Sequence, residues 1–174
     1  MIQLDTSTAL RGQTVPTPDT VPTPDTVPTT GETSAVVGQS APRLRRVGES
    51  DLTVFPLAIS GNVFGWTADD ATTNAILDSY AAQGGNFIDT ADSYAAGRSE
   101  TMIGNWMRSR RNRSDVVIAT KVGKSADNPG LRARVLTRAV HASLQRLGTD
   151  RIDLLYLHID DETVEFEETL LAVD

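Results

Sequence analysis

Four residues with acid–base side chains follow short apolar runs that are typical of strands. Asp89 comes directly after one run and Tyr94 follows five residues later, while Lys121 and His158 come directly after two further runs. The carboxyl ends of parallel strands meet at one edge of a sheet, so we expect these four side chains to lie close together. A carboxylate, a phenol, an amine and an imidazole at one edge could move protons to and from a bound molecule. The spacing therefore predicts a proton-transfer site.

The apolar runs predict a parallel sheet. We expect strands at 57–59, 87–88, 116–119 and 152–157, preceded by a hairpin over 45–55. These strands are apolar without alternation, and this pattern indicates burial on both faces beneath covering helices.

Amphipathic segments between the runs predict the helices. We expect Thr67 to begin a capping box for the first helix and Ser99 to cap the second. The third should bury one face that carries Leu131, Val135, Ala139, Leu144 and Leu147, and a fourth should begin within 165–174. The order of elements is therefore four βα units.

The position of the polar residues favours a barrel over a doubly wound sheet. In a (β/α) barrel the reactive groups lie on loops that follow the carboxyl ends of the strands. A doubly wound nucleotide-binding sheet would instead show a glycine-rich fingerprint after its first strand. Residues 61–65 hold two glycines but neither that spacing nor a P-loop lysine.

Four strings of residues resemble the aldo-keto reductase family. They are Asn-Phe-Ile-Asp-Thr-Ala-Asp-Ser-Tyr at 86–94, Gly-Arg-Ser-Glu at 97–100, Ile-Ala-Thr-Lys at 118–121 and Asp-Leu-Leu-Tyr-Leu-His at 153–158, in the family's order. The resemblance extends over residues 43–174. It implies a (β/α)₈ TIM barrel that reduces aldehyde or ketone carbonyls of small molecules with NADPH.

The resemblance also implies roles for particular residues. Asp89, Tyr94, Lys121 and His158 match the family's catalytic tetrad, and Asn62, Val63, Phe64 and Asp89 would lie beside the nicotinamide end of the cofactor. Carbonyl reduction leaves an alkoxide that must be protonated, and a phenol can act as that general acid. A nearby ammonium would stabilise the phenolate, a carboxylate would compensate the buried ammonium, and an imidazole would orient the substrate oxygen.

Each tetrad residue taken alone has a structural explanation as a loop carboxylate, a packed aromatic, a surface amine or a structural imidazole. Their joint placement favours an inherited reductase site. His141 falls inside the third predicted helix, and we assign it to structure.

The length of the chain raises a second interpretation. A (β/α)₈ barrel takes about 250 residues, whereas 43–174 contains only the first four βα units. We therefore expect a truncated reductase of reduced or no activity, in which exposed half-barrel edges could drive self-association. The alternative is a non-catalytic binding or regulatory protein of the same fold.

Composition excludes several other classes. The formal net charge of −7 argues against general binding to nucleic acid or to an anionic membrane. The chain has no cysteine, no apolar run of ~20 residues and no signal-peptide pattern, so we expect a cytoplasmic protein. Arginines at 108, 110, 111 and 113 fit a helix C-terminus better than a nucleic-acid patch, and acidic residues 160–162 fit a helix cap better than a metal site.

Residues 1–42 differ from the rest of the chain. They hold six of the eight prolines and no Phe, Trp or Tyr, and they repeat Thr-Val-Pro-Thr-Pro-Asp at 14–19 and 20–25. Such a repeat favours extended conformations that bury little surface. We expect a disordered linker-like tail at 1–42, with a binding role for the repeat as the alternative, and a folded domain at 43–174.

Overall fold

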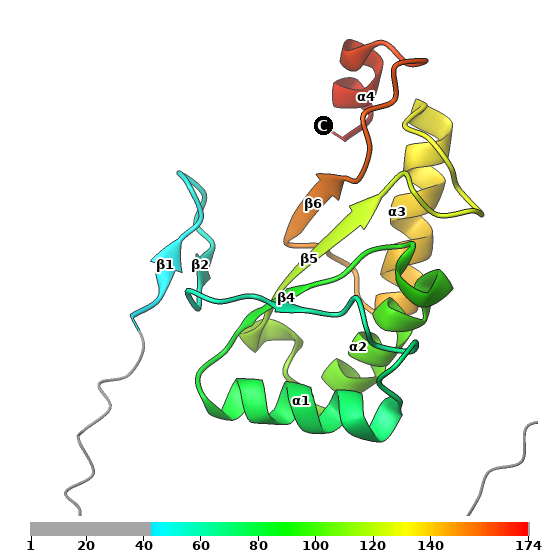
Figure 1. The fold of residues 1–174 in the computed structure, drawn as a ribbon. Coiled ribbons are helices and arrows are strands. Elements are labelled where there is room, and N and C mark those ends of the chain that lie inside the picture. The colour runs from blue at the N-terminus through cyan, green and yellow to red at the C-terminus, as the bar shows by residue number, and fades with distance from the viewer. Residues whose placement is uncertain (1–42, 174) are drawn as a thin grey trace, which may run out of the picture. The chain divides into compact units, whose positions relative to one another are not determined.

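The computed structural model of the chain describes residues 43–173 (Figure 1). The predicted tail at 1–42 and its repeats lie outside the described residues. Within the described range, no helix combines the length and the apolar character that crossing a membrane requires.

Four parallel strands form the central sheet, as the apolar runs predicted. They are β3 (Ile59–Ser60), β4 (Phe87–Asp89), β5 (Val117–Val122) and β6 (Leu154–Leu157), and they lie in chain order. The register pairs Ser60 with Asp89 and Val122 with Leu157, so β3 ends beside β4 and β5 ends beside β6.

The strand predicted at 57–59 is present, but it begins later than expected, at Ile59. Leu57 is 67% exposed and lies in a bend that begins at Pro56, whose ring fixes φ and removes a backbone donor. The hydroxyl of Tyr80 lies 2.6 Å from the carbonyl oxygen of Leu57 and 3.0 Å from that of Phe87, so its single proton can go to either, and it accepts from the amide of Phe87 at 3.1 Å. This side chain therefore takes the place of strand pairing at the entry to the sheet.

The predicted hairpin is confirmed, as the antiparallel pair β1 (Arg45–Arg46) and β2 (Thr53–Val54). Asn86 fixes it to the start of β4, because its side chain accepts from the amide of Phe55 at 2.7 Å and donates to the carbonyl of Thr53 at 3.0 Å.

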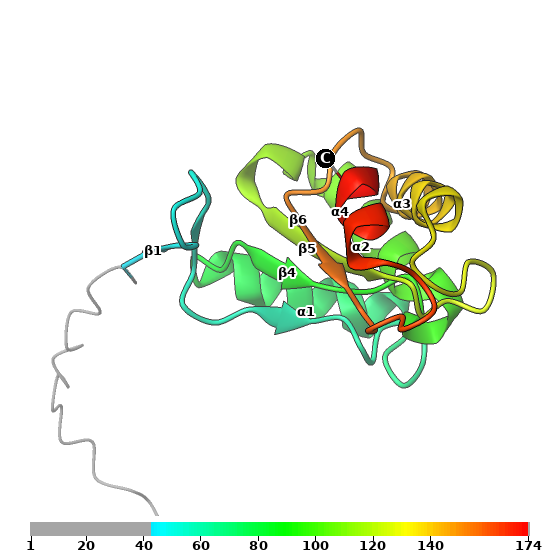
Figure 2. The same cartoon turned by 90° about the horizontal axis from the view of Figure 1, so that it is seen from above.

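Helices follow the strands in turn. They are α1 (Asp70–Ala82), α2 (Arg98–Arg110), α3 (Ala133–Leu147) and α4 (Phe166–Val173), with short 3₁₀ turns η1 (Tyr94–Gly97) and η2 (Arg113–Asp115). Successive helices pack against one another, and α1, α2 and α3 gather on one side of the sheet (Figures 1 and 2). Helices outside a parallel sheet are the arrangement of a (β/α) barrel wall.

Both predicted helix caps are wrong. Asp69 caps α1 in place of Thr67, since its carboxylate accepts from the amide of Thr72 at 2.9 Å. The N-cap of α2 is Gly97, and Ser99 is buried inside the first turn, where its hydroxyl donates to the carbonyl of Gly61 at 2.7 Å. A tertiary contact thus draws Ser99 away from a capping role, whereas Asp69 caps α1 through a local contact.

The buried face of α3 also differs from the prediction. The helix begins at Ala133, so Leu131 is buried in the loop before it. Val135 and Leu144 are only partly buried. The buried positions on α3 are Leu136, Ala139, Ser143 and Leu147.

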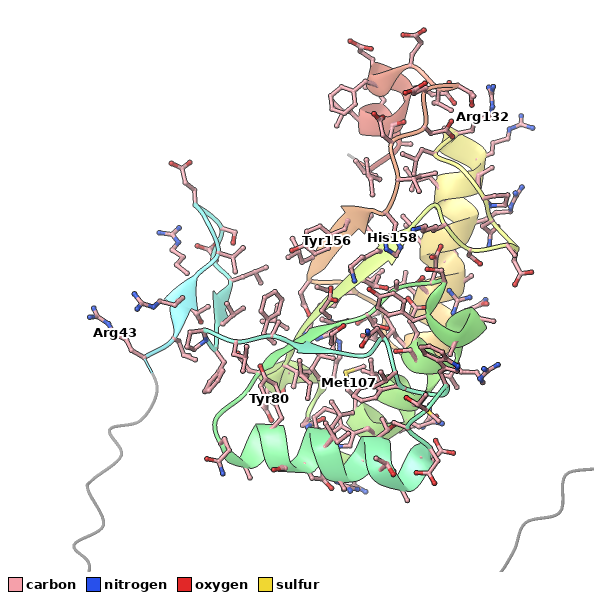
Figure 3. All side chains as sticks on the ribbon, in the orientation of Figure 1. Arg43, Tyr80, Met107, Arg132, Tyr156 and His158 are labelled. Atoms are coloured by element: carbon pink, nitrogen blue, oxygen red, sulfur yellow. The ribbon has the colours of Figure 1, made fainter. Side chains whose placement is uncertain are left out.

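The main core lies between the sheet and helices α1 and α2. Its largest fully buried members include Leu77, Ile88, Ile103, Trp106 and Ile118, and Met107 on α2 lies beside them (Figure 3). Burying each such side chain stabilises the fold by roughly 1.5–3 kcal/mol. This core holds in place the strands whose carboxyl ends carry the predicted acid–base residues.

Candidate active site

The four predicted acid–base residues are brought together at the carboxyl ends of the strands. Asp89 is the last residue of β4, Tyr94 is the first residue of η1, and Lys121 lies one residue before the end of β5. His158 directly follows β6 (Figure 3). We call these four residues the tetrad.

Lys121 is the centre of the tetrad. Its Nζ lies 2.8 Å from Asp89 Oδ2, 2.8 Å from the carbonyl oxygen of Thr90 and 3.1 Å from Tyr94 Oη. These three contacts match the three donors of an ammonium group. The side chains of Lys121 and Asp89 are 17% and 22% exposed, so the ion pair is mostly shielded from water. A fixed ammonium thus lies against a phenol oxygen.

His158 completes the site from the next strand. Its ring meets that of Tyr94 edge to face, with centroids 5.9 Å apart. Burial lowers the pKa of His158, the charges of Lys121 and Lys124 lower it further, and Asp89 opposes them. The imidazole is therefore mainly neutral at pH 7. The hydroxyl of Ser93 lies 3.5 Å from Nδ1 and can fix the orientation of the ring.

The backbone after Tyr94 is strained. Ala95 and Ala96 have φ values of 50° and 55°, and Gly97 continues the left-handed turn with a φ of 82°. Left-handed conformations cost roughly 1–2 kcal/mol for a residue with a Cβ atom. A Cβ atom at Gly97 would come within 2.7 Å of the Arg146 side chain, so this position also requires glycine. Strain of this kind persists where surrounding contacts hold it, often at functional sites.

Buried polar contacts lie beneath the tetrad. The hydroxyl of Ser99 lies 2.9 Å from that of Thr90, which links the start of α2 to the segment after β4. Glu100 is fully buried and accepts from Thr120 Oγ1 at 2.6 Å and from Arg146 Nε at 2.6 Å. These contacts hold β4, β5 and their helices in one arrangement.

The residues expected beside a nicotinamide cofactor differ in exposure. Asn62 is exposed and Val63 is partly buried in the turn after β3. Phe64 is 1% exposed and packs in the main core, so its side chain is not available to a ligand. Any contact from Phe64 would have to come from its backbone.

The other polar clusters have structural partners. Arg110 pairs with Asp78 at 2.7 Å, and Arg113 pairs with Asp153 at 2.8 Å. The prediction that acidic residues 160–162 cap the last helix is wrong, because α4 begins at Phe166 and the Asp161 carboxylate accepts from the amide of Leu131 at 2.9 Å and from Thr163. His141 is exposed on α3, outside the tetrad.

No group of three or more potential metal-binding side chains occurs in the part of the chain that the structure describes.

Several contributors were missed from the sequence. The Thr90 carbonyl that accepts from Lys121 belongs to the backbone, so the residue type gave no signal for it. Ser93 and Asp92 lie within the string that carries Asp89 and Tyr94, and this position was the available signal. Ser60 lies 3.5 Å from Asp89 Oδ2, but its strand was misplaced in the prediction.

Comparisons with known proteins identify the family of the chain. The model of the Aldo/keto reductase family matches residues 58–174. Norsolorinic acid reductase B of Aspergillus parasiticus is 38% identical over 156 residues, which cover 78% of this chain and 41% of that protein. The aldo-keto reductase ausK of Aspergillus calidoustus is 40% identical over 140 residues, which cover 70% of this chain and 35% of that protein. The chain thus spans less than half of these relatives.

A solved structure described as an aldo-keto reductase from Pseudomonas aeruginosa matches the fold. It superposes with a TM-score of 0.67 at 33% sequence identity, over 80% of this chain and 58% of that chain. The expected fold is confirmed as part of a TIM barrel of this type. Since the family model matches residues 58–174, which make up most of the chain and include the whole tetrad, the chain belongs to the aldo/keto reductase family.

Proposed function

We propose that the tetrad reduces aldehyde or ketone carbonyls of small molecules, with NADPH as the hydride source and Tyr94 as the general acid. The observation that carries this proposal is the position of Lys121 Nζ, 3.1 Å from Tyr94 Oη and 2.8 Å from Asp89 Oδ2. An ammonium beside a phenol favours loss of the phenol proton, because it stabilises the phenolate that remains.

Tyr94 would transfer the proton, and the groups around it would support that transfer. The bound cofactor would supply a hydride, which converts the carbonyl to an alkoxide. Tyr94 donates its proton to that oxygen, and Lys121 stabilises the resulting phenolate. Asp89 and the carbonyl of Thr90 hold the ammonium in place and offset the cost of its burial.

His158 would orient the carbonyl oxygen. The Ser93 hydroxyl can donate to Nδ1, and in that tautomer the ring proton lies on Nε2. A neutral imidazole with a proton on Nε2 is a hydrogen-bond donor that does not compete with Tyr94 as the acid. Its lowered pKa keeps this form dominant at neutral pH.

The residues present suit the nicotinamide end of the cofactor. Asn62 offers an exposed amide after β3, and Asp89 offers a carboxylate at the end of β4. The carboxamide group of a nicotinamide can form hydrogen bonds with both groups. We therefore assign Asn62, Val63 and Asp89 to cofactor contact, with the backbone of Phe64.

Self-association is part of the proposal. Within the described residues, β3 and β6 each pair on one side only. Phe166, Leu170, Leu171 and Val173 on α4 are 65%, 45%, 79% and 45% exposed. Unpaired strand edges and exposed apolar side chains favour pairing with another chain. Light scattering on the purified chain should give a mass above that of the monomer, and a stable monomer would refute this part.

Two steps test the activity. Quenching of tryptophan fluorescence measures NADPH binding to the purified chain, and absorbance at the cofactor band measures its oxidation with a reactive aromatic aldehyde. We expect saturable binding and aldehyde-dependent oxidation. Binding without oxidation would favour the alternative, a regulatory or binding protein of this fold, while absence of binding would refute the cofactor assignment for this chain.

The remaining expectations follow from composition. A net charge of −7 and the absence of cysteine support a cytoplasmic protein that does not act on nucleic acid or membranes.

A further inference from the structure

Asp92 is a buried carboxylate next to the tetrad that the proposed chemistry does not use. It lies in the segment between Asp89 and Tyr94 and is 2% exposed. Its Oδ2 accepts from the amide of Gly123 at 3.3 Å, and its own amide donates to the carbonyl of Lys121 at 2.9 Å. One residue therefore joins the segment that carries Tyr94 to the strand end that carries Lys121.

The strand end at Lys121 is held on both sides by buried carboxylates. Before Lys121, the hydroxyl of Thr120 donates to Glu100 at 2.6 Å, and after it Gly123 donates to Asp92. The contact between Lys121 Nζ and Tyr94 Oη crosses the same two segments. The length of that contact should therefore depend on how Asp92 holds the segments together.

The carboxylate form of Asp92 has an energetic cost. Its Oδ1 is buried and has no hydrogen-bond partner among the described residues. Burial raises the pKa of Asp92 to about 6; the nearby Glu100 raises it as well, while the Gly123 amide and Arg146 act in the opposite direction. A buried polar atom without a partner costs free energy. A group that only filled space here would not need a charge.

We infer that Asp92 is a positioning residue, whose carboxylate clips the Tyr94 segment to the Lys121 strand end and so sets the phenol–ammonium contact. This inference rests on the proposed proton transfer from Tyr94. A charged acceptor makes a stronger hydrogen bond to a backbone amide than a neutral one does, which suits a clip between two loops.

NMR on the purified chain tests the inference without any turnover. The variants are Asp92→Ala, which removes the acceptor, Asp92→Asn, which keeps one, and Asp127→Asn, a matched control at an exposed carboxylate in the loop after β5. We expect Asp92→Ala to speed exchange of the Gly123 amide at least about tenfold and to shift the Tyr94 ¹³Cζ resonance. In Asp92→Asn, the exchange rate of the Gly123 amide and the Tyr94 ¹³Cζ resonance should stay close to those of the parent chain. The control should change neither.

A titration of the unmodified chain covers the case in which Asp92→Ala fails to fold. The Asp92 ¹³Cγ resonance reports its own protonation, separately from His158. We expect the Gly123 amide and Tyr94 ¹³Cζ resonances to move with the same midpoint as Asp92, near pH 6. The positioning role would be overturned if the Tyr94 resonance stayed unchanged both during the titration of Asp92 and after loss of the hydrogen bond from the Gly123 amide to Asp92.

These signals do not depend on NADPH. A chain that lacks reductase activity but passes both NMR tests would refute the proposed function and leave the clip intact. For an active chain, Asp92→Ala should lower kcat more than it changes KM for the aldehyde, because the clip acts on the acid rather than on substrate binding.

Discussion

The two ends of the parallel sheet use polar side chains in different ways. At the amino end, Asp153 accepts from the amide of Ile118 at 2.8 Å and pairs with Arg113 and Arg151, so its carboxylate is well satisfied. At the carboxyl end, Asp92 keeps a buried oxygen without a described partner, and the turn after Tyr94 is left-handed at two alanines. The first arrangement serves stability, whereas the second holds groups at an energetic cost, as is common at functional sites.

The largest effect should follow removal of the ammonium at the carboxyl end. Lys121→Met deletes all three contacts of Nζ, so kcat/KM for aldehyde reduction should fall by roughly 100-fold or more. Lys124→Met is the matched control, because this exposed lysine makes no described hydrogen bond to the tetrad. Steady-state kinetics on both variants should separate them, and equal losses would mean that net charge near His158 matters more than the Lys121 contacts.

The amino end should respond in stability and not in catalysis. Asp153→Ala leaves Arg113, 18% exposed, without its carboxylate and frees the Ile118 amide. We expect a loss of about 2–4 kcal/mol in the free energy of unfolding by urea. The exposed Asp150→Ala variant should change it by less than about 0.5 kcal/mol. A large fall in kcat for folded Asp153→Ala would contradict the division between the two ends.

Asp92→Asn should have a smaller and opposite effect on stability. Asp92 binds its proton more tightly in the folded chain, with a pKa of about 6 against an ordinary 3.8. The tighter binding of this proton therefore stabilises the folded state fully below pH 3.8, and this stabilisation is lost as pH rises through 6. A full shift of this size corresponds to roughly 3 kcal/mol.

A neutral amide avoids that loss. Asp92→Asn should therefore be more stable than the parent chain at pH 7.5, by up to about 3 kcal/mol, and the difference should shrink toward pH 4. Urea denaturation at several pH values measures it. A variant less stable than the parent chain at pH 7.5 would show that the carboxylate stabilises the fold, which would remove the energetic distinction between the two ends.

The sequence predicted the parallel sheet and the family because both depend on local patterns. Continuous apolar runs mark buried strands, and Asp89, Lys121 and His158 stand where those runs end. The same patterns did not decide between two neighbouring residues that both suit a helix cap. Thr67 and Asp69 are both good caps, and in the structure the Asp69 carboxylate accepts from the Thr72 amide.

Contacts between distant segments were also beyond local patterns. Ser99 looked like a cap but is drawn into the core by the Gly61 carbonyl 38 residues away. Phe64 matched a cofactor position by resemblance, yet its side chain packs in the main core. The buried position of Asp92 depends on the loop after β5, which no spacing near Tyr94 reveals.

One measurement tests the central claim most directly: aldehyde-dependent oxidation of NADPH by the parent chain and by Tyr94→Phe. The variant keeps the ring and its edge-to-face contact with His158 but lacks the donor. We predict measurable turnover by the parent chain, a loss of about 100-fold or more in the variant, and equal affinity for NADPH. Turnover by Tyr94→Phe within about threefold of the parent rate would contradict Tyr94 as the general acid.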